Sequence, residues 1–188
     1  MHKLFETERL NAFIMDDTGA KQLLAYEMEN KEAFAQFSIA HKDSHYTLAN
    51  FLNICEKQAL LYEQRRKLPL VFVKKNSWPI IATVSLNEIV YGAFRSSFIG
   101  YSVGKAHQRQ GYATEAVKAT IEYAFQTMLL HRIEANIMPK NIPSLSFITT
   151  LGFVNEGLSK NYLYIDGKWE DHYNMVLINE HLDMKKVR

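Results

Sequence analysis

The chain has 188 residues, 47% of them hydrophobic, a length and composition that predict a single domain over residues 1–188 with a buried core. Lysine and arginine number 22 against 20 aspartates and glutamates, a formal net charge of +2; the two signs are interspersed, which excludes a basic stripe for nonspecific nucleic-acid binding. The single cysteine, Cys55, excludes an internal disulfide and a thiolate metal cluster, and no pair of histidines sits in a metal-ligand motif such as H-E-x-x-H.

Apolar runs separated by polar segments predict both strands and helices in the first half of the chain. Asp16 or Asp17 is suited to cap a helix, because a short acceptor side chain satisfies the free amides of a first turn. Pro69 is expected to mark the end of a second helix. The polar turn at residues 74–77 separates two β-rich runs, which is typical of a hairpin. The expected elements are a strand at 9–15, a helix from 16 or 17 to about 30, a helix at 43–66, and strands at 70–73 and 79–86.

The second half predicts strands and helices in alternation. From residue 113 to 128, apolar side chains recur at i, i+3, i+4 and i+7, the pattern of a helix that packs one face on a sheet. Asn141 is suited to cap a short helix that Gly152 ends, and Asp166-Gly167 is a strong turn signal. The expected elements are a strand at 94–104, a helix after 111, a strand at 132–138, a short helix after 141, and hairpin strands at 162–165 and 172–177.

The most informative segment joins the strand at 94–104 to the helix that follows it. Its loop has the spacing Q/R-x-x-G-x-G/A, and the small residues Gly111 and Ala113 let successive backbone amides approach a diphosphate. The free amides and the dipole of a helix N-terminus favour an anion there. The loop is neither a Walker loop nor the G-x-G-x-x-G dinucleotide fingerprint. It predicts a pyrophosphate cradle made of Gln108, Arg109, Gln110, Gly111, Tyr112, Ala113 and Thr114.

A second motif follows about 30 residues after the first. It consists of Asn141-Ile-Pro-Ser144, with the pattern N-x-x-S, and then of residues 151–157, which contain G-F-x-x-E-G. In order and spacing, the two motifs resemble the coenzyme-binding segments of the GCN5-related N-acetyltransferase (GNAT) superfamily. Two independent motifs in the right order are a much stronger signal than either one alone.

Further runs narrow the resemblance to the RimJ group within the RimJ/RimL branch of that superfamily. They lie at residues 7–10, where the chain reads Thr-Glu-Arg-Leu, and at 92–104, 131–136 and 161–172. The resemblance covers essentially the whole chain. It implies acetylation of the α-amino group of proteins, including the N-terminal alanine or serine of ribosomal proteins.

The resemblance also implies the fold. The expected α/β architecture is a mixed, strongly twisted central sheet, flanked by helices and splayed into a V between the strands at 98–103 and 132–138. Acetyl-CoA is expected in the gap as a cosubstrate, because splayed strands leave backbone groups that the pantetheine amides can pair with. The residues expected to contact it, besides the cradle, are Tyr101, Ser102, Val103, Asn136, Asn141, Ser144 and Phe147, and no metal is expected.

Two side chains are the catalytic candidates. Ser144 is suited to hold or protonate the coenzyme sulfur, although a serine at a helix start also satisfies backbone amides. Glu88 is a candidate general base near the incoming amine, although a solvent-exposed glutamate at a strand end is at least as good an interpretation. Many superfamily members carry a general-acid tyrosine one turn after the serine, and this chain has Ile148 there. We expect the oxyanion donor to be a backbone N–H near residues 101–103.

Other residues in the motifs have simpler alternatives. Arg109 is suited to pair with a coenzyme phosphate, but a solvated loop arginine explains it equally well. Tyr112 and Phe147 can be packing residues, and the helix dipole alone explains Glu115 in the first turn. Trp169 and Asp171 match the hairpin of the family, where wall packing and an anchoring hydrogen bond are expected.

The leading hypothesis is therefore a cytoplasmic, acetyl-CoA-dependent acetyltransferase that acts on a protein N-terminus, with no direct nucleic-acid partner and no membrane span or signal peptide expected. A small-amine acetyltransferase for a polyamine, aminoglycoside or amino acid is the alternative within the same scaffold. A noncatalytic acyl-CoA-binding protein that docks on a ribosome is the alternative of another class. Residues 16–67 are expected to form the acceptor wall.

Overall fold

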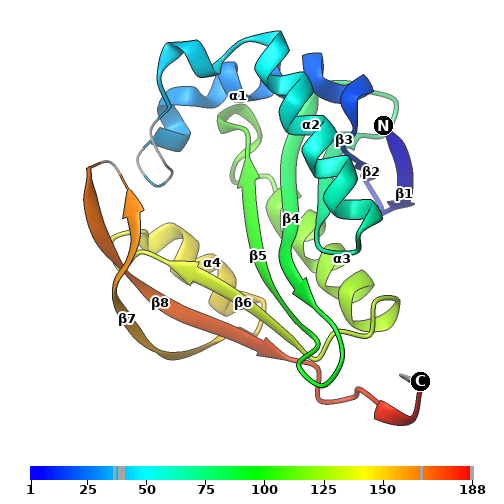
Figure 1. The fold of residues 1–188 in the computed structure, drawn as a ribbon, viewed down its shortest axis with the longest axis vertical. Coiled ribbons are helices and arrows are strands. Elements are labelled where there is room, and N and C mark those ends of the chain that lie inside the picture. Colours follow the sequence, from blue (N-terminus) through cyan, green and yellow to red (C-terminus); the bar gives the residue numbers. More distant parts are fainter. Residues whose placement is uncertain (36, 38–40, 166, 187–188) are drawn as a thin grey trace.

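The computed structural model describes residues 1–35, 37, 41–165 and 167–186, and it places eight strands in one mixed sheet of order β1-β2-β3-β4-β5-β6-β8-β7 (Figure 1). Asp166 of the expected hairpin turn lies outside the described residues. The strands are β1 (His2–Glu6), β2 (Leu10–Ile14), β3 (Leu68–Lys74), β4 (Ile80–Val90), β5 (Ser96–Val103), β6 (Arg132–Ile137), β7 (Val154–Ile165) and β8 (Lys168–Ile178). The α-helices are α1 (Ala20–Ala35), α2 (Leu48–Glu63), α3 (Tyr112–Gln126) and α4 (Ile142–Thr150).

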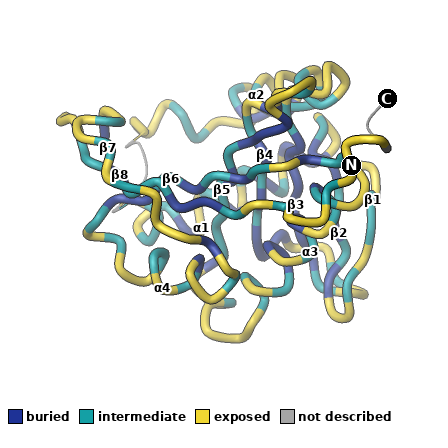
Figure 2. The backbone as a smooth tube through the Cα atoms, turned by 90° about the horizontal axis from the view of Figure 1, so that it is seen from below, coloured by how far each residue is buried: buried dark blue, intermediate teal, exposed yellow. Residues whose placement is uncertain are grey.

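Helices cover both faces of the sheet, because alternate side chains of β3 are buried against different helices. Leu70 and Phe72 belong to the main core, which also holds the buried face of α3 and Ile148 of α4. Val71 and Val73 point to the opposite face and belong to a second core with buried residues of α1 and α2. Figure 2 shows the buried central strands with α2 on one side and α3 and α4 on the other. Buried side chains on both faces explain why β3 reads as a continuous apolar run.

The sheet splits between β5 and β6. These parallel strands pair only at their first three positions, where Ser96, Ser97 and Phe98 lie opposite Arg132, Ile133 and Glu134. On its other edge β5 stays paired with β4 as far as Val103, and β6 stays paired with β8. The strands therefore meet at one end and diverge at the other, which Figure 1 shows as a V that opens toward α1. The splayed mixed sheet expected from the resemblance is confirmed.

Several expected boundaries are wrong. The strand β1 was not expected, and the first helix begins at Ala20 after a short 3-10 turn that Asp16 caps. The second helix is capped by Thr47 and ends at Glu63.

Pro69 does not mark the end of a helix. It lies within β3, where its carbonyl accepts a hydrogen bond from the Met15 amide at 2.9 Å. The strands of the hairpin are longer than expected, because β7 begins at Val154 and β8 at Lys168.

Among the described residues, no helix is both long and apolar enough to cross a membrane. The same part of the chain contains no group of three or more His, Cys, Asp or Glu side chains that could hold a metal ion.

Candidate active site

The loop after β5 leaves the first amides of α3 available for a ligand. Gly111 is the N-cap residue of α3, it has a φ of 81°, and it provides no side-chain hydrogen bond to the first turn. The four N–H groups at the start of an α-helix have no partner within the helix. Here the amides that follow Gly111, with the positive end of the helix dipole, form a site suited to a phosphate group.

The side chains of the expected cradle are mostly exposed. Gln108, Arg109, Gln110 and Thr114 are exposed, while Tyr112 and Ala113 are half-buried. Gln110 donates from Nε2 to the Ala106 carbonyl at 2.8 Å. Arg109 has a φ of 58°, so a left-handed residue at 109 precedes the left-handed Gly111 in this tight loop. The backbone of residues 109–114 is therefore what the fold places at the helix end.

The N-terminal segment is hydrogen-bonded to the cradle and to the first turn of α3, and we call these contacts the brace. The sequence interpretation missed this feature. The Arg9 side chain donates from Nε to Glu115 at 2.6 Å and from Nη1 to the Gln110 carbonyl at 2.9 Å. The Glu115 carboxylate also accepts hydrogen bonds from the Thr7 hydroxyl and from the Arg9 amide. The Arg9 guanidinium lies 4.5 Å from the centre of the Tyr112 ring. Glu115 thus anchors the first turn of α3 to the segment before β2, and its role exceeds the dipole effect expected for it.

This brace makes stability pH-dependent, and we expect Glu115→Gln to remove that dependence. Burial raises the pKa of the Glu115 carboxyl, but the hydrogen bonds from Thr7 and Arg9 outweigh it, so the pKa is lowered overall. A carboxyl whose pKa is lower in the folded state adds stability above its unfolded pKa, and this stability is lost as pH falls through the folded pKa. Wild type should be about 1–2 kcal/mol more stable than the variant at pH 7.

The measurement is the Tm of both proteins from pH 7 to pH 3. The gap between the two should close as the pH falls below the ordinary glutamate pKa of 4.5. A constant gap over this range would contradict the assignment.

Ser144 and Tyr101 meet at the opening of the V. The Ser144 Oγ atom lies 2.7 Å from the Tyr101 hydroxyl. Asn141, the N-cap residue of α4, accepts from the Ser144 amide at 3.2 Å, so the capping role that was the alternative for Ser144 belongs to Asn141. The Phe147 ring, one turn later, packs edge-on against Tyr101 at 5.2 Å. The structure therefore brings Tyr101, Asn141, Ser144 and Phe147 together.

Asn136 lies on the other wall of the V, on β6. The residues around it, Ala135 and Ile137, are buried in the main core, so strand alternation turns Asn136 to the opposite face of the sheet. Its Nδ2 donates to the Tyr162 hydroxyl of β7 at 2.9 Å. Its Oδ1 is buried and has no hydrogen-bond partner in the described part of the chain. A buried acceptor without a partner carries a free-energy cost, so this oxygen suits a ligand that donates an N–H.

Ser102 and Val103 complete the β5 wall through their backbone. The Ser102 hydroxyl points away from α4, because it lies 2.9 Å from the Tyr26 hydroxyl and 2.8 Å from that of Thr83. Val103 packs against the main core. Beyond Phe98, the edge of β5 that faces β6 has no strand partner among the described residues, which matches the expectation of free backbone groups near 101–103.

Glu88 stands apart from this cluster. It lies in a bulge of β4, with a φ of 47°, and the strand continues past it to Val90 rather than ending there. Its side chain is 70% exposed and is 3.5 Å from Arg66. Val84, four residues earlier, is the partner of Tyr101, so Glu88 is roughly 13 Å further along the strand at about 3.3 Å per residue. Its role as a base stays a prediction.

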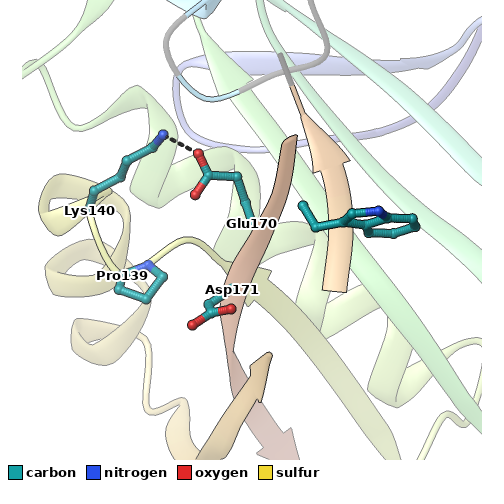
Figure 3. Close-up of a pocket in the computed structure, with 5 residues that line it drawn as sticks. Pro139, Lys140, Glu170 and Asp171 are labelled. Atoms are coloured by element: carbon teal, nitrogen blue, oxygen red, sulfur yellow. Dashed lines mark hydrogen bonds and ion pairs between the residues drawn. The ribbon is translucent and has the colours of Figure 1, made fainter. Parts of the chain in front are cut away.

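Strand β8 forms a shallow pocket of about 340 Å³ with the loop that follows β6. Figure 3 shows Lys140 reaching from that loop to Glu170, with which it forms an ion pair of 2.7 Å. The expected anchoring bond is present, since Asp171 accepts from the Asn161 amide at 2.8 Å. Trp169, for which wall packing is expected, is 59% exposed and packs edge-on against Tyr164.

A sheet opened between two parallel strands, beside an uncapped helix N-terminus that follows one of them, defines an acetyltransferase of the GNAT type. A family model described as the acetyltransferase (GNAT) domain matches residues 10–154. The chain belongs to this family and is an N-acetyltransferase.

Known proteins resemble this chain over most of its length. The probable N-acetyltransferase YjcK of Bacillus subtilis is 37% identical over 88% of this chain and 91% of its own. The crystal structure of the ribosomal-protein-S5-alanine acetyltransferase of Vibrio fischeri is 32% identical, with a TM-score of 0.88 over 95% of this chain and 98% of its own. RimJ of Mycobacterium smegmatis, solved with a CoA disulfide, is 26% identical, with a TM-score of 0.86 over 92% of this chain and 83% of its own.

Proposed function

We propose that this protein transfers an acetyl group from acetyl-CoA to the α-amine of a protein N-terminus, with alanine or serine as the first residue. The observation that carries the coenzyme half is the V between β5 and β6, which leads directly into the uncapped start of α3. The buried, unpartnered Oδ1 of Asn136 supports a ligand with amide N–H groups in this opening. The likeness to a ribosomal-protein-S5-alanine acetyltransferase and to RimJ supports the acceptor half.

Direct transfer needs positioning more than covalent chemistry. The thioester carbonyl would lie along the free edge of β5, where a backbone N–H near residues 101–103 can stabilise the oxyanion. Ser144 would face the sulfur from the start of α4. Holding both reactants in one site contributes roughly 7–11 kcal/mol in favourable cases. No covalent enzyme intermediate is required.

A cavity beside the V supports a peptide acceptor over a polyamine. It measures about 250 Å³ and lies between α1, α2 and the strands β3 and β4. Thr83 lines it and hydrogen-bonds Ser102 of β5, which joins the cavity to the V.

The charges in this cavity do not suit a polycation. The cavity holds one carboxylate, Glu27, and one lysine, Lys67. Burial raises the pKa of Glu27 and lowers the pKa of Lys67. A polyamine site needs several carboxylates, and the other described lining residues contribute none. The volume suits one or two small residues, in accordance with an N-terminal alanine or serine.

The test is acetyl transfer from acetyl-CoA to peptides that begin with Ala, Ser or Met, compared with spermidine and an aminoglycoside and followed by mass spectrometry. We expect a gain of one acetyl group on the α-amine of the Ala and Ser peptides. Acetylation of a small amine alone would replace the substrate and keep the enzyme class. Coenzyme binding without transfer to any amine would favour the noncatalytic binding protein.

A further inference from the structure

We propose that Tyr101 is a positioning residue for the transfer: its hydroxyl orients the Ser144 hydroxyl so that Ser144 donates a hydrogen bond to the sulfur of the departing coenzyme. This inference rests on the proposed acetyl transfer, but not on the identity of the acceptor amine. The two residues lie 43 positions apart in the chain and come from different elements, β5 and α4.

The residues around Tyr101 and Ser144 hold both side chains in position. The Tyr101 and Ser144 oxygens are 2.7 Å apart. Packing of the Tyr101 ring on Phe147 holds the ring in place. The cap by Asn141 fixes the backbone of Ser144. Each hydroxyl is thus held by its own element, and their contact joins the β5 wall of the V to the start of α4.

Either hydroxyl can donate in this contact, and the proposal takes Tyr101 as the donor. Burial raises the pKa of Tyr101 to about 12, even though the bond with Ser144 acts in the opposite direction. The phenol therefore keeps its proton across the neutral range and can donate it to the Ser144 oxygen. A serine hydroxyl has one hydrogen and two acceptor positions. When Tyr101 fills an acceptor position, the serine hydrogen is free to point elsewhere.

This arrangement differs from a tyrosine at residue 148. The Ile148 side chain, one turn after Ser144, is fully buried in the main core and offers no hydroxyl to the serine. The phenol that reaches the serine in this chain comes from strand β5 instead of from the next turn of α4.

The step balances without any further reactant. The neutral amine nitrogen forms a bond to the thioester carbon, and the carbonyl electron pair moves to oxygen. On collapse, the carbon–sulfur bond breaks and its electron pair stays on sulfur, while the proton of the amine passes to water. The Ser144 hydrogen bond stabilises the thiolate, which takes a proton from solvent, and neither Ser144 nor Tyr101 loses its proton.

A double-mutant cycle tests the proposal with Tyr101→Phe, Ser144→Ala and the double variant. Tyr101→Phe keeps the ring contact with Phe147 and removes only the hydroxyl. It should lower kcat about tenfold, because the Ser144 hydroxyl loses its orientation toward the charged sulfur, and leave the KM for acetyl-CoA within about twofold. Ser144→Ala should lower kcat at least as much. The double variant should be no slower than Ser144→Ala, because Tyr101 acts through Ser144.

Tyr123→Phe is the matched control, since Tyr123 lies in α3 and stacks on Phe5 far from the V; its kcat should equal that of wild type. An unchanged kcat in Tyr101→Phe, additive losses in the double variant, or a loss seen in KM alone would each overturn the proposal. The cycle is run on whichever amine wild type acetylates, so a wrong acceptor would leave it intact. A wild type that acetylates no amine overturns both the proposed function and this inference.

Discussion

Replacing Gly111 by aspartate is expected to weaken acetyl-CoA binding at least about 100-fold, close to 3 kcal/mol, while the protein stays folded. Gly111 is the N-cap residue of α3 and directly precedes the free amides of its first turn. A carboxylate at this position occupies the same N–H donors that a diphosphate needs. It also places a like charge beside the phosphates, which is worth about 4 kcal/mol at 4 Å near a protein surface.

The fold should tolerate the change. Aspartate is among the residues that adopt a left-handed backbone most readily. A Cβ atom at residue 111 would come within 3.1 Å of Arg9 Nη2, so this nitrogen has to shift by only a few tenths of an ångström. An acidic group at a helix N-terminus moreover favours the helix. We therefore expect a Tm within a few degrees of wild type.

Gly92→Asp is the matched control for backbone strain. Gly92 has a φ of 73°, and an added Cβ would meet nothing within 4 Å. It lies between β4 and β5, at the end of the sheet where the V is closed. Isothermal titration with CoA should show wild-type affinity for this control and the loss for Gly111→Asp. Equal affinity in all three proteins would disprove the assignment of the loop.

The elements that could be predicted from the sequence are those in which the apolar pattern of a short segment matches the residues that the fold buries. The apolar stripe of α3 matches the buried face that packs on the sheet. The alternation along β6 matches its alternating burial. The Asn141 cap and the Gly111 loop are also local, because the residues that make them lie within a few positions of one another.

What local patterns miss are the contacts between distant segments. The exposed edge strand β1 has no buried stripe, and pairing with β2 alone makes it a strand. Pro69 reads as a helix breaker, yet β3 accommodates it because its carbonyl, which is all that proline can offer, still bonds Met15. Neither feature has a signal within its own segment.

In the candidate site too, local motifs could be predicted and contacts between distant segments could not. The cradle and Ser144 could be found from motif spacing, whereas their partners could not. Tyr101 comes to Ser144 only through the divergence of β5 from β6, and Arg9 comes to Glu115 across 106 positions. The Thr-Glu-Arg-Leu run at 7–10 is one of the segments that resemble the RimJ group. It is explained by the brace that Thr7 and Arg9 form under α3.

Introducing the missing tyrosine with Ile148→Tyr is expected to destabilise the protein and not to accelerate it. Ile148 has no exposed surface, so the larger ring overpacks the core and its hydroxyl is buried without a partner designed for it. Together these effects should cost about 3 kcal/mol, which lowers the Tm of a domain of this size by roughly 10 °C. Ser146→Tyr, at an exposed position of the same helix, should leave the Tm almost unchanged.

The kcat of the Ile148→Tyr variant tests whether residue 148 or the Tyr101–Ser144 pair faces the departing coenzyme. If residue 148 turns into the core, kcat of the folded Ile148→Tyr protein should not exceed that of wild type, because the phenol cannot reach the V. A stable and faster variant would show that residue 148 faces the coenzyme, and the Tyr101–Ser144 pair would then lose its special position. Thermal unfolding and steady-state kinetics are measured on the same preparation. If Ile148 faces the core, the Ile148→Tyr protein loses stability and gains no rate, and both results must appear together.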